Sequence, residues 1–118
     1  MKEYLKDSPK TAHDFLEDAV KTTEKGIKRD DNKPQFRLIP QMALLEAAKV
    51  MTFGAKKYAP NNWMLVKDGH DRYIDAALRH INAHLTGEVV DPESELPHLS
   101  HAVCSLMMAQ HFHLEKKK

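Results

Sequence analysis

Four of the eight histidines in this 118-residue chain have a spacing that can bring imidazole groups together. His80 and His84 are four residues apart, and His98 and His101 are three residues apart, so each pair shares one side of a predicted helix. The first pair falls on the apolar stripe that contains Ala77. Imidazole binds metal ions, transfers protons and changes its charge near neutral pH. The spacing therefore predicts polar groups that point into a helical core.

A carboxylate is predicted to face the same interior. Glu46 shares a helix face with Met42, Val50 and Phe53. Carboxylates are rarely buried unless they are paired or bound to a metal. Three helices thus direct metal-competent groups inward, which indicates a polar pocket for a metal ion or an anionic ligand. The alternative is that each histidine is an ordinary core residue, hydrogen-bonded to a carbonyl group or a neighbouring side chain.

Basic and aromatic residues gather where one predicted helix ends. The stretch GAKKYAPNNW, residues 54–63, combines cations, amides and aromatic rings, and two arginines follow on the next helix. Such a set suits a nucleotide, because cations bind phosphates, aromatic rings stack on bases and amides hydrogen-bond base edges. The alternative is solvated lysines beside a tryptophan that covers a small core. The candidate substrate-binding residues are Lys56, Lys57, Tyr58, Asn61, Asn62, Trp63, Arg72 and Arg79.

The elements that must position these residues are helical. Apolar periodicity and helix start and stop signals predict helices at residues 8–26, 41–58, 71–85 and 97–112. Residues 27–40 hold two prolines and many charges, which predicts an extended connector. The expected fold is all-α, a bundle of about four helices in a single domain, residues 1–118, with residues 1–26 as an N-terminal helical extension. The buried side of the last helix is expected to carry Leu99, Ala102, Val103 and Leu106.

An acidic connector, residues 88–95, precedes the last helix. Its carboxylates belong to Glu88, Asp91, Glu93 and Glu95. One interpretation is that this connector supplies oxygen ligands to a divalent ion. The other is a solvated acidic loop, in which Asp91 and the following proline form a plain turn.

Composition excludes several classes of function. The net charge of +1 gives no reason to expect a specific nucleic acid or a membrane as partner, and no apolar run is long enough to cross a bilayer. Cys104 is the single cysteine, which fits a cytoplasmic protein, and its apolar neighbours favour a small core residue. A chain of this length has a limited core of its own, so we expect a homo-oligomer.

Several segments together resemble a known family. DNKPQFRLIP, ALLEAAKVMTFGAKKYAPNNW and RYIDAALRHINAHLTGEVVDPESELPHLSHAV resemble the phage-enriched N-terminal domain family of dATP/dGTP diphosphohydrolases, over roughly residues 27–112. That family looks related to MazG-like, all-α nucleotide pyrophosphohydrolases, in which carboxylate pairs bind Mg²⁺ over the phosphates. In this chain His98 and His101 stand where such enzymes have a Glu-x-x-Asp pair.

The resemblance implies a metal-assisted diphosphohydrolase acting on the phosphate chain of a purine (deoxy)nucleoside triphosphate. In this hypothesis a divalent metal, Mg²⁺ or Mn²⁺, activates water, and the basic residues stabilise charge on the phosphates. The alternative is a non-catalytic protein that sequesters a nucleotide signal of host defence, and a third hypothesis is a structural oligomer. The predicted catalytic residues are Glu46, His80, His98 and His101, and the predicted metal ligands are Glu46, Asp91, His98 and His101.

Overall fold

A computed structural model describes residues 25–116 of the chain. It contains three α-helices, α3 (Gln41–Lys57), α4 (Gly69–Leu85) and α5 (His98–Glu115), and two short 3₁₀ turns, η1 (Phe36–Leu38) and η2 (Asn62–Leu65). Contacts divide the chain into residues 1–34 and 35–118, and all three α-helices belong to the second unit. The all-α class is confirmed. The bundle of four is not, because nearly all of the helix predicted at residues 8–26 lies outside the described residues.

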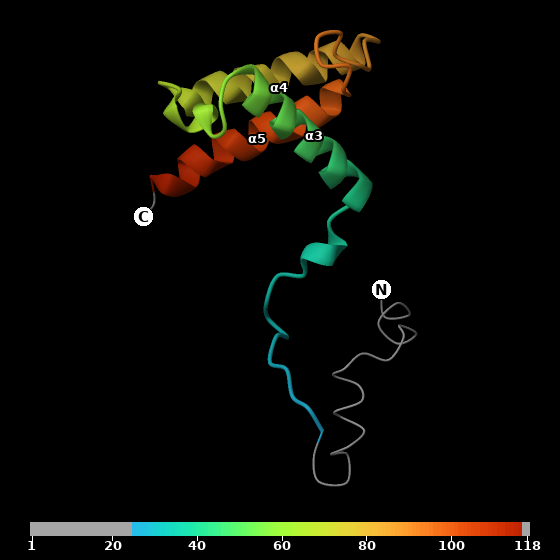
Figure 1. The fold of residues 1–118 in the computed structure, drawn as a ribbon, viewed down its shortest axis with the longest axis vertical. Helices are drawn as coiled ribbons and strands as arrows, with labels where there is room; N and C mark the ends of the chain where they lie inside the picture. The colour runs from blue at the N-terminus through green and yellow to red at the C-terminus, as the bar shows by residue number, and fades with distance from the viewer. Residues whose placement is uncertain (1–24, 117–118) are drawn as a thin grey trace. The chain divides into compact units, whose positions relative to one another are not determined.

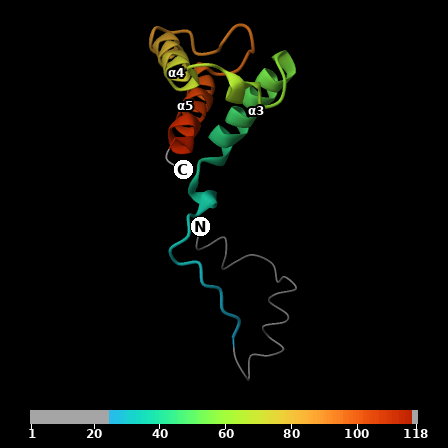
Figure 2. The ribbon, with the colours of Figure 1, turned by 90° about the vertical axis from the view of Figure 1, so that its left-hand side faces the viewer.

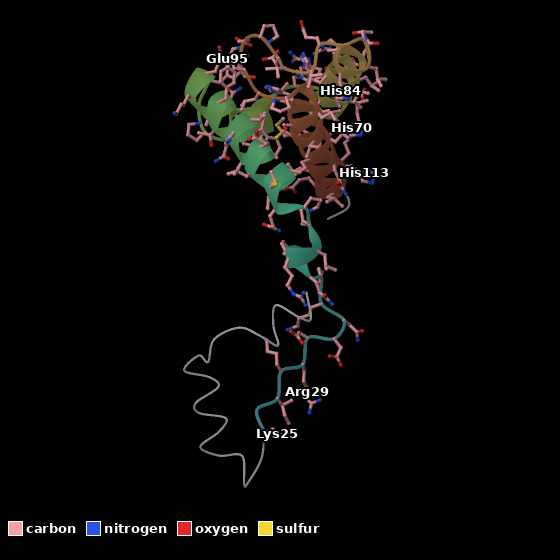
Figure 3. The ribbon with its side chains drawn as sticks, turned by 90° about the vertical axis from the view of Figure 1, so that its right-hand side faces the viewer. Lys25, Arg29, His70, His84, Glu95 and His113 are labelled. Atoms are coloured by element: carbon pink, nitrogen blue, oxygen red, sulfur yellow. The ribbon has the colours of Figure 1, made fainter. Side chains whose placement is uncertain are left out.

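The helix α5 holds the second unit together. It runs beside α4 (Figure 1) and lies between α4 and α3 (Figure 2), which contact each other much less than either contacts α5. Figure 3 shows His84 toward the end where Glu95 lies, and His70 toward the end where His113 lies. The helices α4 and α5 therefore run in opposite directions. Within residues 25–116, no helix is both long enough and apolar enough to span a membrane.

The helix boundaries follow the signals in the sequence closely. The helix α3 starts directly after Pro40 and ends one residue before its predicted end. The helix α4 starts two residues earlier than predicted, after Asp68 in the left-handed conformation, and Gly87 follows its end at φ 105°. The helix α5 starts one residue later than predicted and continues to Glu115. The connector at residues 27–40 contains no α-helix, but the 3₁₀ turn η1 interrupts it.

Small side chains form the core between the helices. Cys104 is fully buried, and its thiol donates a hydrogen bond to the carbonyl oxygen of Ala47 at 3.2 Å, which ties α5 to α3. Burial raises the pKa of the Cys104 thiol to about 11, so this residue is a core residue, as predicted. The buried apolar residues of the described chain are Ala47, Val50, Ala77, Ala102, Cys104 and Ala109.

The predicted buried side of α5 is wrong in three of its four positions. Ala102 is buried, but Leu99, Val103 and Leu106 remain 45%, 45% and 46% exposed. The reason is that α5 approaches two neighbouring helices through its small side chains, which allow close packing, and this turns the larger apolar side chains outward. Met42, predicted to share the inner face of α3, is likewise 85% exposed.

The structure describes a single chain, so the homo-oligomer expected from the limited core stays a prediction.

The start of α4 depends on a glycine. A β-carbon at Gly69 would lie 2.4 Å from Cε2 of Phe112, whose ring packs against Trp63 and Tyr73. Any larger residue therefore displaces a ring that two aromatic neighbours hold in place. A β-carbon at Gly54, in α3, would meet no neighbouring atom within 4 Å, so a methyl group fits there without displacement.

We predict opposite effects for alanine at these two glycines. Gly69→Ala should lower the free energy of unfolding by about 1–3 kcal/mol, the usual cost of overpacking. Gly54→Ala should raise it by up to about 1 kcal/mol, because alanine favours the helix interior. Urea denaturation of both variants measures the two changes. Equal effects of both substitutions would contradict the packing of Phe112 on Gly69.

Candidate functional site

One cavity of about 800 Å³ brings most of the predicted site residues together. Its walls come from the second half of α3, the segment around η2, one side of α4, the acidic connector and α5. Glu46, Lys56 and His98 do not line it. The predicted residues that line it are Lys57, Tyr58, Asn61, Asn62, Trp63, Arg72, Arg79, His80, Asp91 and His101. Its volume is in the range of small-molecule sites.

The acidic connector is a folded loop. Backbone hydrogen bonds join Asp91 N–H to the Leu96 carbonyl at 2.9 Å and His98 N–H to the Val89 carbonyl at 2.9 Å, and Val90 pairs with Pro97 as an isolated antiparallel bridge. These bonds fold the connector back on itself at the start of α5. The loop therefore places the carboxylates of Glu88 and Asp91 beside the two histidines in the first turn of α5.

His98 is a buried polar residue with both ring nitrogens in use. Only 5% of the residue is exposed. Its Nε2 lies 2.7 Å from the Glu88 carboxylate, and its Nδ1 lies 2.8 Å from Nδ1 of His80 on α4. His98 therefore links the connector to α4 from behind the cavity wall, and it is the buried member of the histidine group.

His101 belongs to a second hydrogen-bonded chain. Its Nε2 lies 2.7 Å from the Ser94 hydroxyl, and that hydroxyl donates to Oδ2 of Asp91 at 2.9 Å. Because the single hydroxyl proton goes to Asp91, His101 must donate its Nε2–H to Ser94. The imidazole ring of His101 stacks on that of His80, with ring centroids 4.6 Å apart and an angle of 15° between the planes.

The surroundings keep the cavity histidines neutral and the aspartate ionised. Burial lowers the pKa of His80, and the neighbouring His101 and His98 lower it further. Burial also lowers the pKa of His101, although Asp91 opposes the effect. Burial acts to raise the pKa of Asp91, but hydrogen bonds from Ser94 and the nearby imidazoles outweigh it and leave that pKa below its usual value. Neutral imidazoles can accept a proton.

The predicted metal ligands are not assembled as one set. His98 uses both of its nitrogens, Glu46 lies outside the cavity lining, and Oδ2 of Asp91 accepts hydrogen bonds from both the backbone and the hydroxyl of Ser94. Among residues 25–116, no group of three His, Cys, Asp or Glu side chains is placed to hold a metal ion. This donor arrangement does not fit a divalent ion, and the metal stays a prediction from the sequence.

Glu46 and His84 lie elsewhere. Glu46, predicted to face the shared interior, forms an ion pair with Lys49 on the same helix, with Oε2 and Nζ 2.9 Å apart but without hydrogen-bond geometry. His84 follows His80 by one turn, and its buried Nδ1 makes no hydrogen bond within the described part of the chain. Neither residue lines the cavity, so the i, i+4 spacing brings only one member of its histidine pair to the site.

The basic side of the cavity is formed by α3 and α4. The Lys57 ammonium pairs with the Glu93 carboxylate at 2.7 Å, and this hydrogen bond raises the pKa of Lys57. Nζ of Lys57 also lies 5.3 Å from the ring centroid of Tyr58. Arg72 and Arg79 line the cavity from α4, whereas Lys56 is exposed outside it. Cationic side chains and the two histidines His80 and His101 therefore line the same cavity.

Trp63 has a packing role as well as a place in the lining. Its ring meets the rings of His111 and Phe112 edge to face, with centroids 5.0 Å and 5.9 Å apart. The interpretation of Trp63 as a cover for a small core is therefore supported alongside its contact with the cavity. Tyr58, at 66% exposure, is the freer aromatic side chain.

The sequence patterns do not predict the contacts of four residues that build this site. Glu88 and Glu93 stand out only as members of an acidic connector, and Ser94 and Tyr73 have no predicted role in the site. The Asp91-to-Ser94 spacing is a recognisable signal, because aspartate often accepts hydrogen bonds from residues shortly after it in a turn. The partners of Glu88 and Glu93 lie far along the chain, and no local pattern marks them.

Acidification should destabilise the fold through the histidines before it affects Asp91. Because the pKa values of His80 and His101 lie below the ordinary 6.5, the unfolded chain binds protons first, and the free energy of unfolding falls as the pH drops below 6.5. The stabilisation from Asp91, whose pKa is lowered from 3.8, is lost only at lower pH. Melting temperatures between pH 7.5 and about 4.5 isolate the histidine effect. His101→Gln should reduce this pH dependence relative to the exposed control His113→Gln, and an unchanged dependence would refute the assignment.

Comparisons with known proteins agree with the resemblance. A family described as dATP/dGTP diphosphohydrolase, N-terminal, matches residues 23–118. The dATP/dGTP diphosphohydrolase of Salmonella phage PMBT28 is 35% identical over 82 residues, which is 70% of this chain and 28% of that relative. The chain thus covers only 28% of the length of this curated relative. No solved structure matches the chain. Because the family match spans most of the sequence, the chain belongs to the dATP/dGTP diphosphohydrolase N-terminal family.

Proposed function

We propose that this chain binds a purine nucleoside triphosphate in the cavity and hydrolyses it to a nucleoside monophosphate and inorganic pyrophosphate. The observation that carries the proposal is that one cavity joins the cations of α3 and α4 to His80, His101 and Asp91, whose lowered pKa values favour neutral imidazoles and an ionised carboxylate. The name of the phage relative, a dATP/dGTP diphosphohydrolase, supports this reaction and a purine base.

The basic residues bind the phosphate chain in this proposal. Lys57, Arg72 and Arg79 line the cavity, and their charges complement a triphosphate. The exposed ring of Tyr58 offers a surface on which the base can stack, and the amides of Asn61 and Asn62 are suited to hydrogen-bond its edges. The same cations stabilise the charge that develops on the leaving diphosphate.

In this proposal a cavity histidine accepts a proton from the attacking water. The water oxygen forms a bond to the α-phosphorus while the bond from that phosphorus to the bridging oxygen breaks, and diphosphate leaves with the bonding electron pair. The proton released by the water passes to a neutral imidazole nitrogen of the cavity. A divalent ion remains a predicted companion of this reaction, and no step here depends on it.

A second candidate is a nucleotide-binding protein without catalysis, which would sequester a nucleotide signal of host defence. One observation favours it. The predicted metal ligand His98 uses both ring nitrogens in contacts with Glu88 and His80, so neither nitrogen is free to bind a metal ion. The basic and aromatic residues proposed to bind a nucleotide do line the cavity. Binding needs only the basic and aromatic part of the cavity.

Incubation with nucleotides separates the two candidates. The purified chain is mixed with each deoxynucleoside triphosphate, and with ATP and GTP, in Mg²⁺, in Mn²⁺ and in a chelator, and the products are identified by mass spectrometry. We expect dATP or dGTP to give the deoxynucleoside monophosphate and inorganic pyrophosphate. Loss of turnover in the chelator would support the predicted requirement for a divalent metal. Retention of an unchanged nucleotide would favour the binding protein, and neither turnover nor retention would contradict both proposals.

Neighbouring lysines provide a matched test of the binding mode. Arg79→Ala should weaken nucleotide binding by about 10-fold to 100-fold, the range for losing a charge-assisted hydrogen bond. Lys57→Ala should also weaken binding, whereas Lys56→Ala, outside the cavity, should not. Glu93→Gln should strengthen binding, because it removes the carboxylate that pairs with Lys57. Calorimetric titration measures all four, and equal effects of the two lysine variants would argue against this cavity.

A further inference from the structure

The contacts of His98 constrain where its protons lie. The Glu88 carboxylate only accepts hydrogen bonds, so Nε2 of His98, 2.7 Å away, carries a hydrogen. The remaining contact joins two nitrogens, Nδ1 of His98 and Nδ1 of His80, at 2.8 Å. A hydrogen bond between two nitrogens holds one proton, so either His80 donates it or His98 does. If His98 donates it, His98 carries hydrogen on both nitrogens and is a cation.

Burial decides between these two arrangements. His98 is 5% exposed, whereas its acidic partner Glu88 keeps 57% of its side chain exposed to water. A buried imidazolium is costly, and a solvated carboxylate compensates for it only partly. The arrangement with two neutral rings is therefore preferred, in which His80 donates its Nδ1–H to His98. The lone pair of His80 is then on Nε2, the only other polar atom of its side chain.

Nε2 of His80 is available to a ligand. It makes no hydrogen bond within the part of the chain that the structure describes, and it is not fully buried. His80 lines the cavity, while His98 and Glu88 do not. The ring of His101, stacked at 4.6 Å, restricts rotation of the His80 ring. The unprotonated nitrogen of His80 is thus offered to the cavity, and the protonated nitrogen is held behind it.

We infer that Glu88 and His98 are positioning residues that hold His80 in the tautomer with hydrogen on Nδ1, so that its Nε2 accepts the proton of the attacking water. The catalytic part of this inference rests on the proposed hydrolysis, whereas the tautomer does not. When Nε2 takes the water's proton, His80 becomes a cation that keeps its Nδ1–H bonded to His98, and His98 stays neutral with its own hydrogen directed at Glu88.

Nuclear magnetic resonance of the full chain tests the tautomer directly. In a chain labelled with ¹⁵N-histidine, two-bond proton–nitrogen correlations distinguish protonated from unprotonated ring nitrogens, and His80→Gln assigns the signals. At pH 7.5 we expect His80 to be protonated on Nδ1 only, and His98 on Nε2 only. Hydrogen on Nε2 of His80, or on both nitrogens of His98, would overturn the inference whether or not the protein hydrolyses nucleotides.

Removal of the carboxylate tests the link to the reaction. Glu88→Ala should weaken the preference of His80 for the Nδ1–H tautomer and lower kcat by about 10-fold to 100-fold with little change in KM, as expected for loss of a group that orients a catalytic side chain. The control is Asp75→Ala, which removes an exposed carboxylate of α4 that does not line the cavity. If Glu88→Ala matches this control in both spectrum and kcat, Glu88 has no positioning role. If the wild-type chain turns over no nucleotide, the proposed function fails, and the spectra still decide the tautomer.

Discussion

The burial of His98 between two polar partners is the interaction on which the rest of the site depends. A polar side chain inside a small helical core is tolerated only when its hydrogen bonds are satisfied, and here the connector and α4 each provide one. The backbone takes part as well, since the His98 N–H bonds to Val89 and closes the connector onto α5. One residue therefore fixes the start of a helix, the path of a loop and the orientation of a cavity histidine. A change at His98 would affect all three together.

The small side chains of α5 make this arrangement possible. Ala102, Ser105 and Ala109 are buried, whereas Leu99, Val103, Leu106 and Met107 are exposed. Short side chains bring the backbone of α5 close to its neighbours, which leaves the longer imidazole and aromatic rings to occupy the space toward the cavity. The core and the site are therefore parts of one packing arrangement, in which α5 contributes to both.

Much of the fold was accessible from the sequence, because helix propensity and capping are local. Pro40, Pro97 and Gly87 mark boundaries that the structure reproduces within one or two residues. Helical spacing also placed His80 on the inner side of α4, whereas its meeting with His101 and Lys57 depends on how the three helices pack. The side of α5 that is buried could not be predicted, because Leu99 and Val103 resemble core residues until the packing of the two neighbouring helices is known.

The partners of the histidines were inaccessible for a related reason. Glu88 and Ser94 reach His98 and His101 only because the connector folds back, and that path depends on backbone hydrogen bonds that no residue pattern announces. Glu46, predicted to face inward, has a buried Oε2 that pairs with Lys49 on the same helix, outside the cavity lining. Sequence periodicity thus assigned side chains to a helix face, but it did not identify their partners.

The ion pair between Lys57 and Glu93 gives the cavity an internal competitor for anions. The carboxylate is tethered beside the ammonium at 2.7 Å, so its effective concentration there is of the order of millimolar or higher. An anionic ligand must displace the Glu93 carboxylate before it can bind the Lys57 ammonium. In the proposed binding mode a triphosphate would also engage Arg72 and Arg79 and could displace Glu93, whereas a monophosphate with fewer charges would compete poorly. The pair would thus act as a threshold on ligand charge, retaining the substrate of the proposed reaction and releasing its nucleotide product.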